Sequence, residues 1–167
     1  MIPGMGSKQI PIGLYLAQVA KTVRFAFGEA LAAEGGSIHT WVILLSLMNE
    51  EPPTQSDLAE SVGIRGPTLT HHLNAMEKEG LLTRNPLPEN RRAHQVSLTA
   101  QGIAKFDQLR RVAISFDQKL RGGFSSEDLE RLRALLGGLA ANVGATRPDF
   151  RSDQAGGTCG FDIEQSE

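Results

Sequence analysis

Apolar residues recur at intervals of three and four over most of the chain, and this spacing predicts amphipathic helices. The first, from about Pro11 to Glu34, is more apolar than one neighbour could cover. It is either a well-buried core helix or, as we favour, a helix shared with a second subunit. Ile38 to Asn49 contains no charged residue and is predicted to be buried on most sides. Two helices follow later, at Thr99 to Leu120 and at Ser125 to about Asn142.

Two shorter helices are predicted between these long ones. Thr54 and Asp57 form a variant of the capping box at the start of the first, and Gly63 is placed to end it. The second runs from about Pro67 to Glu79, with proline in its first turn and Gly80 as its stop. The turn between the two helices is only four residues long. This arrangement is typical of a helix-turn-helix, whose second helix can lie in a major groove.

The second helix separates apolar from polar residues. Leu69, Leu73 and Met76 cluster within about 60° of one another around its axis. The other side and its flanks carry small polar or basic residues: Thr68, Thr70, His71, Asn74 and Lys78. On a lone helix this pattern would indicate an ordinary solvated surface. Behind a first helix and a tight turn, we interpret it as the polar face of a recognition helix.

After Gly80 the apolar period changes to two, which predicts a β-hairpin. Leu81 to Arg84 and Gln95 to Leu98 are the expected strands. Residues 85–93 are predicted to form a loop too long for a tight turn, with Arg91 and Arg92 near its tip. Adjacent loop arginines are usually just solvated. Beside a recognition helix they are well placed to enter the minor groove or bind phosphates.

The stretch TQSDLAESVGIRGPTLTHHLNAMEKEGLLTR, followed by PENRRAHQVSLTAQG, resembles the MarR family of bacterial transcription regulators. Helix, turn, wing and the LT-x-x-G sequence that opens the next helix occur in the family's order, and the resemblance extends to about residue 142. It implies a mainly α fold with a small β wing: a winged helix-turn-helix at about 54–99, flanked by dimerisation helices at about 11–34 and 99–142. Residues 1–10 are then a leader and 143–167 a flexible tail.

Three positions depart from the family's pattern. The family usually has a small hydroxyl residue where Arg65 stands and an arginine where His71 stands, so base readout is expected to differ. It usually has an aspartate at Asn90, which helps to hold the wing arginine. Arg92 is therefore expected to be less rigidly aimed.

The resemblance implies a homodimer that binds a pseudo-palindromic site in double-stranded DNA. The candidate DNA-binding residues are Gln55, Ser56, Arg65, Pro67, Thr68, Thr70, His71, Asn74, Lys78, Arg84, Arg91 and Arg92. The expected activity is repression, relieved when a small aromatic or phenolic acid binds between the dimerisation and DNA-binding parts. The candidate ligand-binding residues, which would supply aromatic walls and a cation or imidazole for a carboxylate, are Tyr15, Arg24, His39 and Trp41.

A net charge of −2 is low for a DNA-binding protein. Much of the acidity lies in the C-terminal tail, since residues 1–142 carry 15 basic and 14 acidic side chains. DNA affinity would then depend on a local basic patch. The modest charge also fits an alternative class, a winged-helix module for protein interaction without specific DNA readout. The wing arginines and the polar face of the second helix argue against that alternative.

Catalysis, a metal site and a cofactor are not expected. The chain has no Gly-x-Ser-x-Gly elbow, no P-loop and no Gly-x-Gly-x-x-Gly turn. His71 and His72 are adjacent, so on a helix their side chains diverge by about 100° and cannot chelate one ion together. His72 falls beside the apolar stripe and is expected to be a partly buried packing residue. Aromatic residues, at 5%, are too sparse to indicate a single-strand-binding surface.

The sequence predicts a cytoplasmic protein without a membrane partner. It has no uninterrupted apolar stretch long enough to span a bilayer and no signal-peptide pattern at its N-terminus. Its single cysteine, Cys159, excludes an intramolecular disulfide and fits a reducing compartment. With no visible resolving partner or pKa-lowering neighbour, Cys159 is expected to be an inert thiol.

Overall fold

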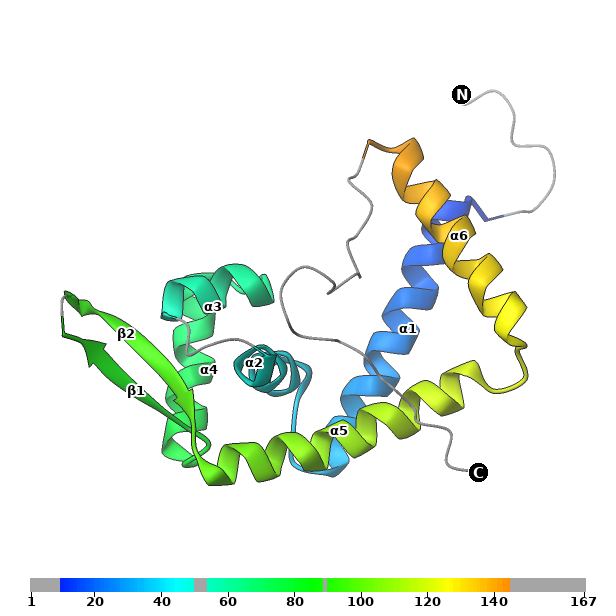
Figure 1. Cartoon of the computed structure of the whole chain (residues 1–167). Helices are drawn as coiled ribbons and strands as arrows, with labels where there is room; N and C mark the ends of the chain where they lie inside the picture. The colour runs from blue at the N-terminus through cyan, green and yellow to red at the C-terminus, as the bar shows by residue number, and fades with distance from the viewer. Residues whose placement is uncertain (1–9, 50–53, 89, 145–167) are drawn as a thin grey trace.

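The computed structural model describes residues 10–49, 54–88 and 90–144. Its elements, in chain order, are α1 (Ile12–Ala33), α2 (Ile38–Asn49), α3 (Gln55–Val62), α4 (Gly66–Lys78), β1 (Leu82–Leu87), β2 (Asn90–Leu98), α5 (Ala100–Arg121) and α6 (Ser126–Asn142). The β1–β2 wing lies at one end of the molecule, α1 and α6 lie toward the other, and α5 runs between them (Figure 1). The predicted mainly α fold with a β wing is confirmed, and each predicted helix is present within a residue or two. Most of the predicted leader and tail lies outside the described residues.

Local sequence signals fix the ends of α3 and α4. Thr54 and Asp57 form the predicted capping box, in which the Thr54 hydroxyl accepts from the Asp57 amide and the Asp57 carboxylate accepts from the Thr54 amide. Gly63 ends α3 in the left-handed conformation, with a φ of 64°. Gly80 follows α4 with a φ of 74°, a conformation that other residues rarely adopt. These two glycines therefore set where the recognition helix can begin and end.

The wing differs from its prediction. The strands extend well into residues 85–93, which were expected to form a long loop: β1 continues to Leu87 and β2 already begins at Asn90. A regular antiparallel register holds as far as Pro86 opposite His94, after which Leu87 pairs with Asn90. Both strands of a two-stranded sheet are edge strands, so a proline can remain in one of them without breaking the ladder. The hairpin is consequently longer than its apolar pattern indicated.

A further connection ties the wing to the helix-turn-helix. Thr54 forms an isolated antiparallel bridge with Gln95 of β2, directly before α3 begins. At the other end of β2, the Thr99 hydroxyl caps α5 by accepting from the Gly102 amide. A Cβ on Gly102 would lie 1.9 Å from the Leu81 carbonyl oxygen, so α5 rests directly on the backbone that leads into β1. This contact explains the glycine of the LT-x-x-G sequence.

The hydrophobic core lies beneath the helix-turn-helix and the first half of α5. Its buried side chains include Ile43, Leu44, Leu58, Leu69, Leu73, Met76, Leu82, Val96, Phe106 and Leu109. Trp41 of α2 stacks on Phe106 of α5, with ring centroids 5.5 Å apart and an interplanar angle of 3°. The uncharged helix α2 thus occupies the centre of the unit, as its composition predicted.

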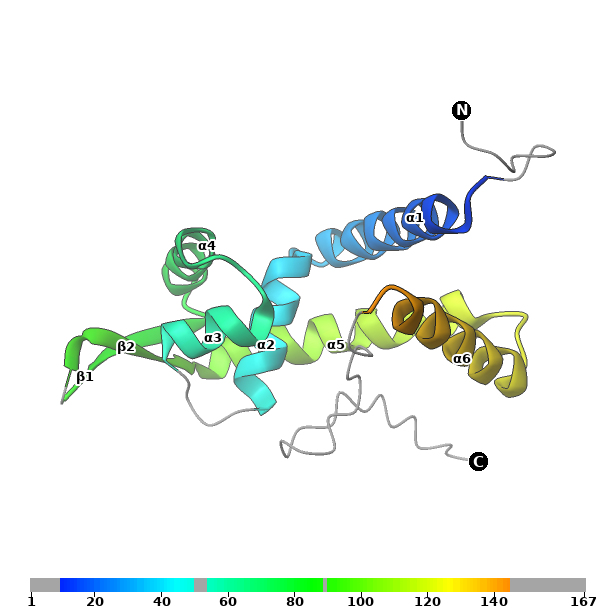
Figure 2. The ribbon, with the colours of Figure 1, turned by 90° about the horizontal axis from the view of Figure 1, so that it is seen from above.

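The opposite end of the molecule leaves its apolar residues uncovered. Leu31 is the one buried residue of α1, whereas Ile12 and Phe25 are 61% and 70% exposed. No described side chain of α6 is buried. Figure 2 shows α1 and α6 leaving α5 in different directions. Among the described residues no single helix is long and apolar enough to cross a membrane, and α1 with α2 reaches that length only across an 80° bend.

Candidate nucleic-acid interface

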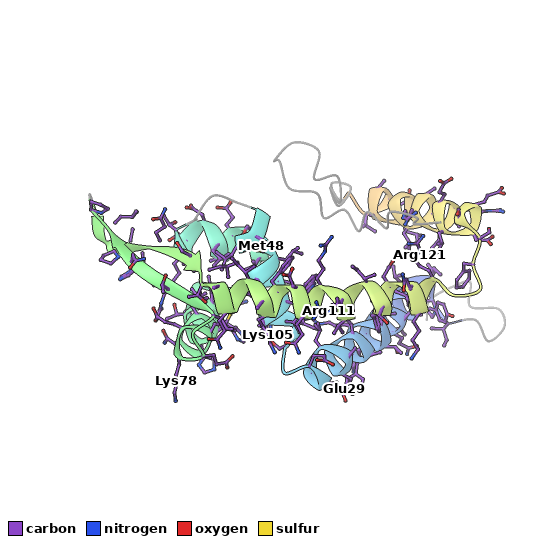
Figure 3. All side chains as sticks on the ribbon, turned by 60° about the horizontal axis from the view of Figure 1, so that its bottom comes forward. Glu29, Met48, Lys78, Lys105, Arg111 and Arg121 are labelled. Atoms are coloured by element: carbon purple, nitrogen blue, oxygen red, sulfur yellow. The ribbon has the colours of Figure 1, made fainter. Side chains whose placement is uncertain are left out.

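The polar face of α4 is exposed along its length. The exposed positions that the sequence analysis proposed for this helix and the turn before it are Arg65, Pro67, Thr68, His71, Asn74 and Lys78. Leu69 and Leu73 on the other side are fully buried, and Met76 is 3% exposed. Lys78 extends away from the rest of the molecule (Figure 3). The predicted division of this helix into a core side and a polar outer side is confirmed.

Gln55 and Thr70 connect the first helix of the motif to the second. The Gln55 Nε2 amide donates to the Thr70 hydroxyl over 2.6 Å, and that hydroxyl donates in turn to the Gly66 carbonyl oxygen at 3.0 Å. The hydroxyl hydrogen of Thr70 is therefore used within the protein. This pair fixes the angle between α3 and α4 and so sets how α4 is presented.

Arg84 of β1 is bound to the recognition helix. Its Nε and Nη2 donate to Oε2 of Glu77 at 3.1 Å and 2.5 Å, and its backbone amide donates to Oε1 of Glu77 at 3.2 Å. Nη2 also donates to Oδ1 of Asn74 at 2.6 Å. Hydrogen bonding by Arg84 is the main cause that lowers the pKa of Glu77. The guanidinium of Arg84, a candidate DNA contact, is thus hydrogen-bonded to two side chains of α4, and its side chain is 18% exposed.

A surface cavity of about 770 Å³ lies between α3, α4 and the wing. Its walls are Thr54, Gln55, Ser56, Ala59, Gly66, Thr70, Glu77, Arg84, Ala93 and His94. Ser56, also a candidate DNA-binding residue, is exposed at its rim near the start of α3. The Gln55–Thr70 and Arg84–Glu77 hydrogen bonds therefore line the space that separates the wing from the helix-turn-helix.

The four candidate ligand residues lie apart in the single chain. Trp41 is buried against Phe106, and His39 stacks on His72 of α4 with ring centroids 4.4 Å apart. Tyr15 and Arg24 are both exposed on α1. They are nine residues apart, which places them on opposite sides of that helix. None of the four lines the cavity beside the wing.

The other residues considered from the sequence are the wing arginines, Cys159 and the histidines. Arg91 and Arg92 lie in the first part of β2, where Leu87 pairs with Asn90 and the regular register is interrupted. Their side chains, and Cys159, lie outside the described part of the structure.

His72 is half-buried, as predicted, and burial is the main cause that lowers its pKa, with the neighbouring His39 and His71 adding to it. In the described part of the chain, no three His, Cys, Asp or Glu side chains are grouped to hold a metal ion.

Comparison with known proteins agrees with this geometry. The MarR family model matches residues 37–94. The solved structure of transcriptional regulator PA3341 is 30% identical to this chain, covers 80% of it and 98% of its own length, and superposes with a TM-score of 0.65. Two further solved structures, both of protein–DNA complexes, share the fold. The transcriptional repressor CouR, bound to a 23-mer duplex, is 23% identical, with coverages of 80% and 99% and a TM-score of 0.70. The S. aureus MepR–DNA complex is 19% identical, with the same coverages and a TM-score of 0.71. The chain therefore belongs to the MarR family of transcriptional regulators.

Proposed function

We propose that this protein is a homodimeric regulator that binds a pseudo-palindromic site in double-stranded DNA. The observation that carries the proposal is the exposed polar face of α4, set on a buried apolar stripe and flanked by the wing. Thr68, His71 and Lys78 lie on that face at spacings of three and seven residues, which suits a helix lying along a major groove. CouR and MepR, which share this fold, have been solved with DNA.

The exposed apolar helices support the homodimer. Leu132, Leu135 and Leu136 of α6 are 49%, 61% and 38% exposed, and α1 adds Ile12 and Phe25. Contiguous apolar surface of this kind usually marks an interaction site. A second copy of the chain would cover it with the same helices, and the resulting two-fold axis would match the symmetry of a palindromic DNA site.

The regulatory part of the proposal is repression in the cytoplasm, relieved by a small aromatic or phenolic acid. Tyr15, Arg24, His39 and Trp41 are its proposed binding residues. Because Tyr15 and Arg24 lie on the helix that a second copy would cover, the pocket would be completed only in the dimer. An acid that binds one spacing of the two recognition helices better than another changes DNA affinity in proportion to that difference.

Binding to genomic DNA fragments tests the proposal directly. The fragments include the region upstream of the protein's own gene, and binding is measured at two salt concentrations with and without salicylate. Saturable, sequence-selective binding that salicylate weakens is the expected result. Selective binding without release would keep the DNA-binding regulator and discard the effector class. Weak, unselective binding that salt abolishes would favour the alternative of a protein-interaction module.

The contribution of the wing is tested by Arg91→Ala with Arg92→Ala. If both arginines contact phosphates, DNA affinity falls equally for all sequences, and the salt dependence loses about one unit of slope per arginine. The matched control is Arg110→Ala with Arg111→Ala, an adjacent exposed pair on α5. Equal losses from both double variants would assign the effect to total charge and not to the wing.

A further inference from the structure

We propose that Arg84 sets the base preference of α4 by fixing the side-chain amide of Asn74. In this orientation Asn74 presents hydrogen-bond donors to the groove, and the base it selects is guanine. The inference rests on the proposed function, because it requires α4 to lie in a major groove. Asn74 and Arg84, both candidate DNA-binding residues, then have different roles: Asn74 contacts the base, and Arg84 positions Asn74.

The chemistry of the Arg84–Asn74 contact determines which way the amide points. A guanidinium has only donors, so the Asn74 atom that lies 2.6 Å from Nη2 must be the oxygen, Oδ1. Arg84 belongs to β1, and Oδ1 therefore faces the wing. Asn74 is exposed, and within the described residues its Nδ2 has no partner. The two Nδ2 hydrogens are left to face outward.

Glu77 keeps Arg84 in this position. Both of its carboxylate oxygens accept from Arg84, one from the side chain and one from the backbone amide. The side chain of Arg84 is only 18% exposed, whereas that of Glu77 is 38% exposed. A partly exposed ion pair contributes little to folding stability. Its consequence here is geometric, because a guanidinium bound on two sides cannot turn away from Asn74.

Orientation of the amide decides which base edge fits. An unrestrained asparagine reads adenine through both of its polar atoms, by accepting from N6 and donating to N7. Because Oδ1 is hydrogen-bonded to Arg84 and directed at the wing, Asn74 does not present this acceptor to adenine N6. Guanine presents two neighbouring acceptors, N7 and O6, in the major groove. Nδ2 has only donors, so it can donate to either of these acceptors, and guanine is preferred to adenine at the position Asn74 reaches.

The first experiment uses the wild-type protein and selects its preferred DNA site from a random library. Guanine in each half-site is then replaced, one position at a time, by adenine or by 7-deazaguanine. At one guanine per half-site, each replacement is expected to weaken binding by about 5- to 150-fold, the range of a good base contact. In Asn74→Ala that discrimination is lost at the same position and retained at the others.

The second experiment separates Arg84 from Asn74. Arg84→Met retains an apolar stem and the backbone amide but removes the guanidinium donors, so Oδ1 is released and the preference at that position shifts from guanine toward adenine. In the double variant with Asn74→Ala, the Arg84 substitution has no further effect on base preference. Lys78→Ala is the control, since an exposed lysine that contacts phosphate lowers affinity for all sequences without changing preference.

Several results would overturn the inference. One is adenine at the position that depends on Asn74, another is an unchanged preference at every position in Asn74→Ala, and a third is a folded Arg84→Met variant that still prefers guanine. If Arg84→Met does not fold, the base replacements on the wild type and on Asn74→Ala decide the question. Failure of the wild type to select any sequence contradicts the proposed function itself, and is distinguished in this way from failure of the inference.

Discussion

The helix-turn-helix unit and the α1–α6 end are both rich in apolar residues, but they use them differently. In the unit, α2, α3 and α4 direct Leu44, Leu58 and Leu73 into one core where each is fully buried. At the other end, Phe25 of α1 and Leu135 of α6 are 70% and 61% exposed. The first region buries its apolar side chains within a single chain, whereas the second leaves apolar side chains exposed, as the proposed homodimer requires.

The two regions also differ in the contacts that hold their helices in place. The recognition helix is held by core packing, by the Gln55–Thr70 hydrogen bond and by the Arg84–Glu77 pair. Helix α6 has a capped N-terminus but no buried side chain. Most helix stability in proteins comes from tertiary packing of an apolar face, which α6 lacks in the described part of the chain. The position of α4 therefore depends on the fold of one chain, whereas in the proposed homodimer the spacing between the two copies of α4 would depend on how α1 and α6 pack.

Placing charge on the exposed apolar side chains of α6 is expected to have the largest effect. Leu132→Asp with Leu136→Asp is expected to convert the proposed dimer to monomers, because each carboxylate would have to be buried without a partner. A monomer loses the second half-site, so affinity for a palindromic site should fall by about 100- to 10,000-fold. Light scattering coupled to size exclusion and a DNA titration measure both effects.

The matched control for that variant is Ala134→Asp, an exposed position on the opposite side of the same helix. It should leave the dimer and the DNA affinity nearly unchanged. If the double aspartate variant remains dimeric, α6 does not form the interface. If it becomes monomeric without losing DNA affinity, the two half-sites do not act together.

Gly102→Ala is expected to have the next largest effect, a loss of folding stability in the helix-turn-helix unit. The new Cβ would collide with the Leu81 carbonyl oxygen, which is backbone and cannot rotate away. Overpacking of this kind costs about 1–3 kcal/mol, more than the helix gains from replacing glycine. Thermal unfolding measures the loss. Gly138→Ala, which has open space around its Cβ in α6, should not lower the unfolding temperature; an equal loss in both variants would exclude the backbone contact as the cause.

Helix positions were predictable because their signals are local. The Thr54–Asp57 and Ser125–Asp128 capping boxes and the terminal glycine Gly63 each act within a few residues of the helix end they fix. The class of protein was predictable as well, because the order of the motifs along the chain identified a family of regulators. Family membership confirms the prediction that the protein is not an enzyme. The length of the wing was not predictable, since Pro86 is compatible with a strand only where it lies at a sheet edge.

The hydrogen bonds of Arg84 to Glu77 and Asn74 could not be predicted from the sequence either. Glu77, Asn74 and Arg84 come from a helix and the following strand, and nothing in their spacing shows that β1 returns alongside α4. Polarity correctly placed Asn74 on the outer face but could not say which amide atom points outward. Long-range contacts of this kind appear only when the fold brings the elements together.

The two capping boxes offer a smaller and more direct comparison between the regions. Thr54→Ala should destabilise the helix-turn-helix unit by about 1 kcal/mol, at any protein concentration. Ser125→Ala removes the same motif from α6, and its effect should appear as weaker dimerisation that grows on dilution. Unfolding curves at two protein concentrations distinguish the two. A concentration-independent effect of Ser125→Ala would show that α6 is stable without a partner.

Protonation of His72 should give the smallest effect, since this side chain is only half-buried at the contact between α2 and α4. Burial, His39 from α2 and His71 on α4 all lower its pKa from the usual 6.5, so folding favours the neutral ring. The unfolded chain binds the proton more readily, and stability is therefore full above pH 6.5 and declines as the pH falls through that value toward the folded pKa. Unfolding temperatures at pH 7.5 and 5.5 should show a smaller decline for His72→Phe than for the wild type. His94→Phe, an exposed histidine on the wing, is the control. Equal declines in all three proteins would mean that the stacked histidines do not couple α4 to α2 through their charge.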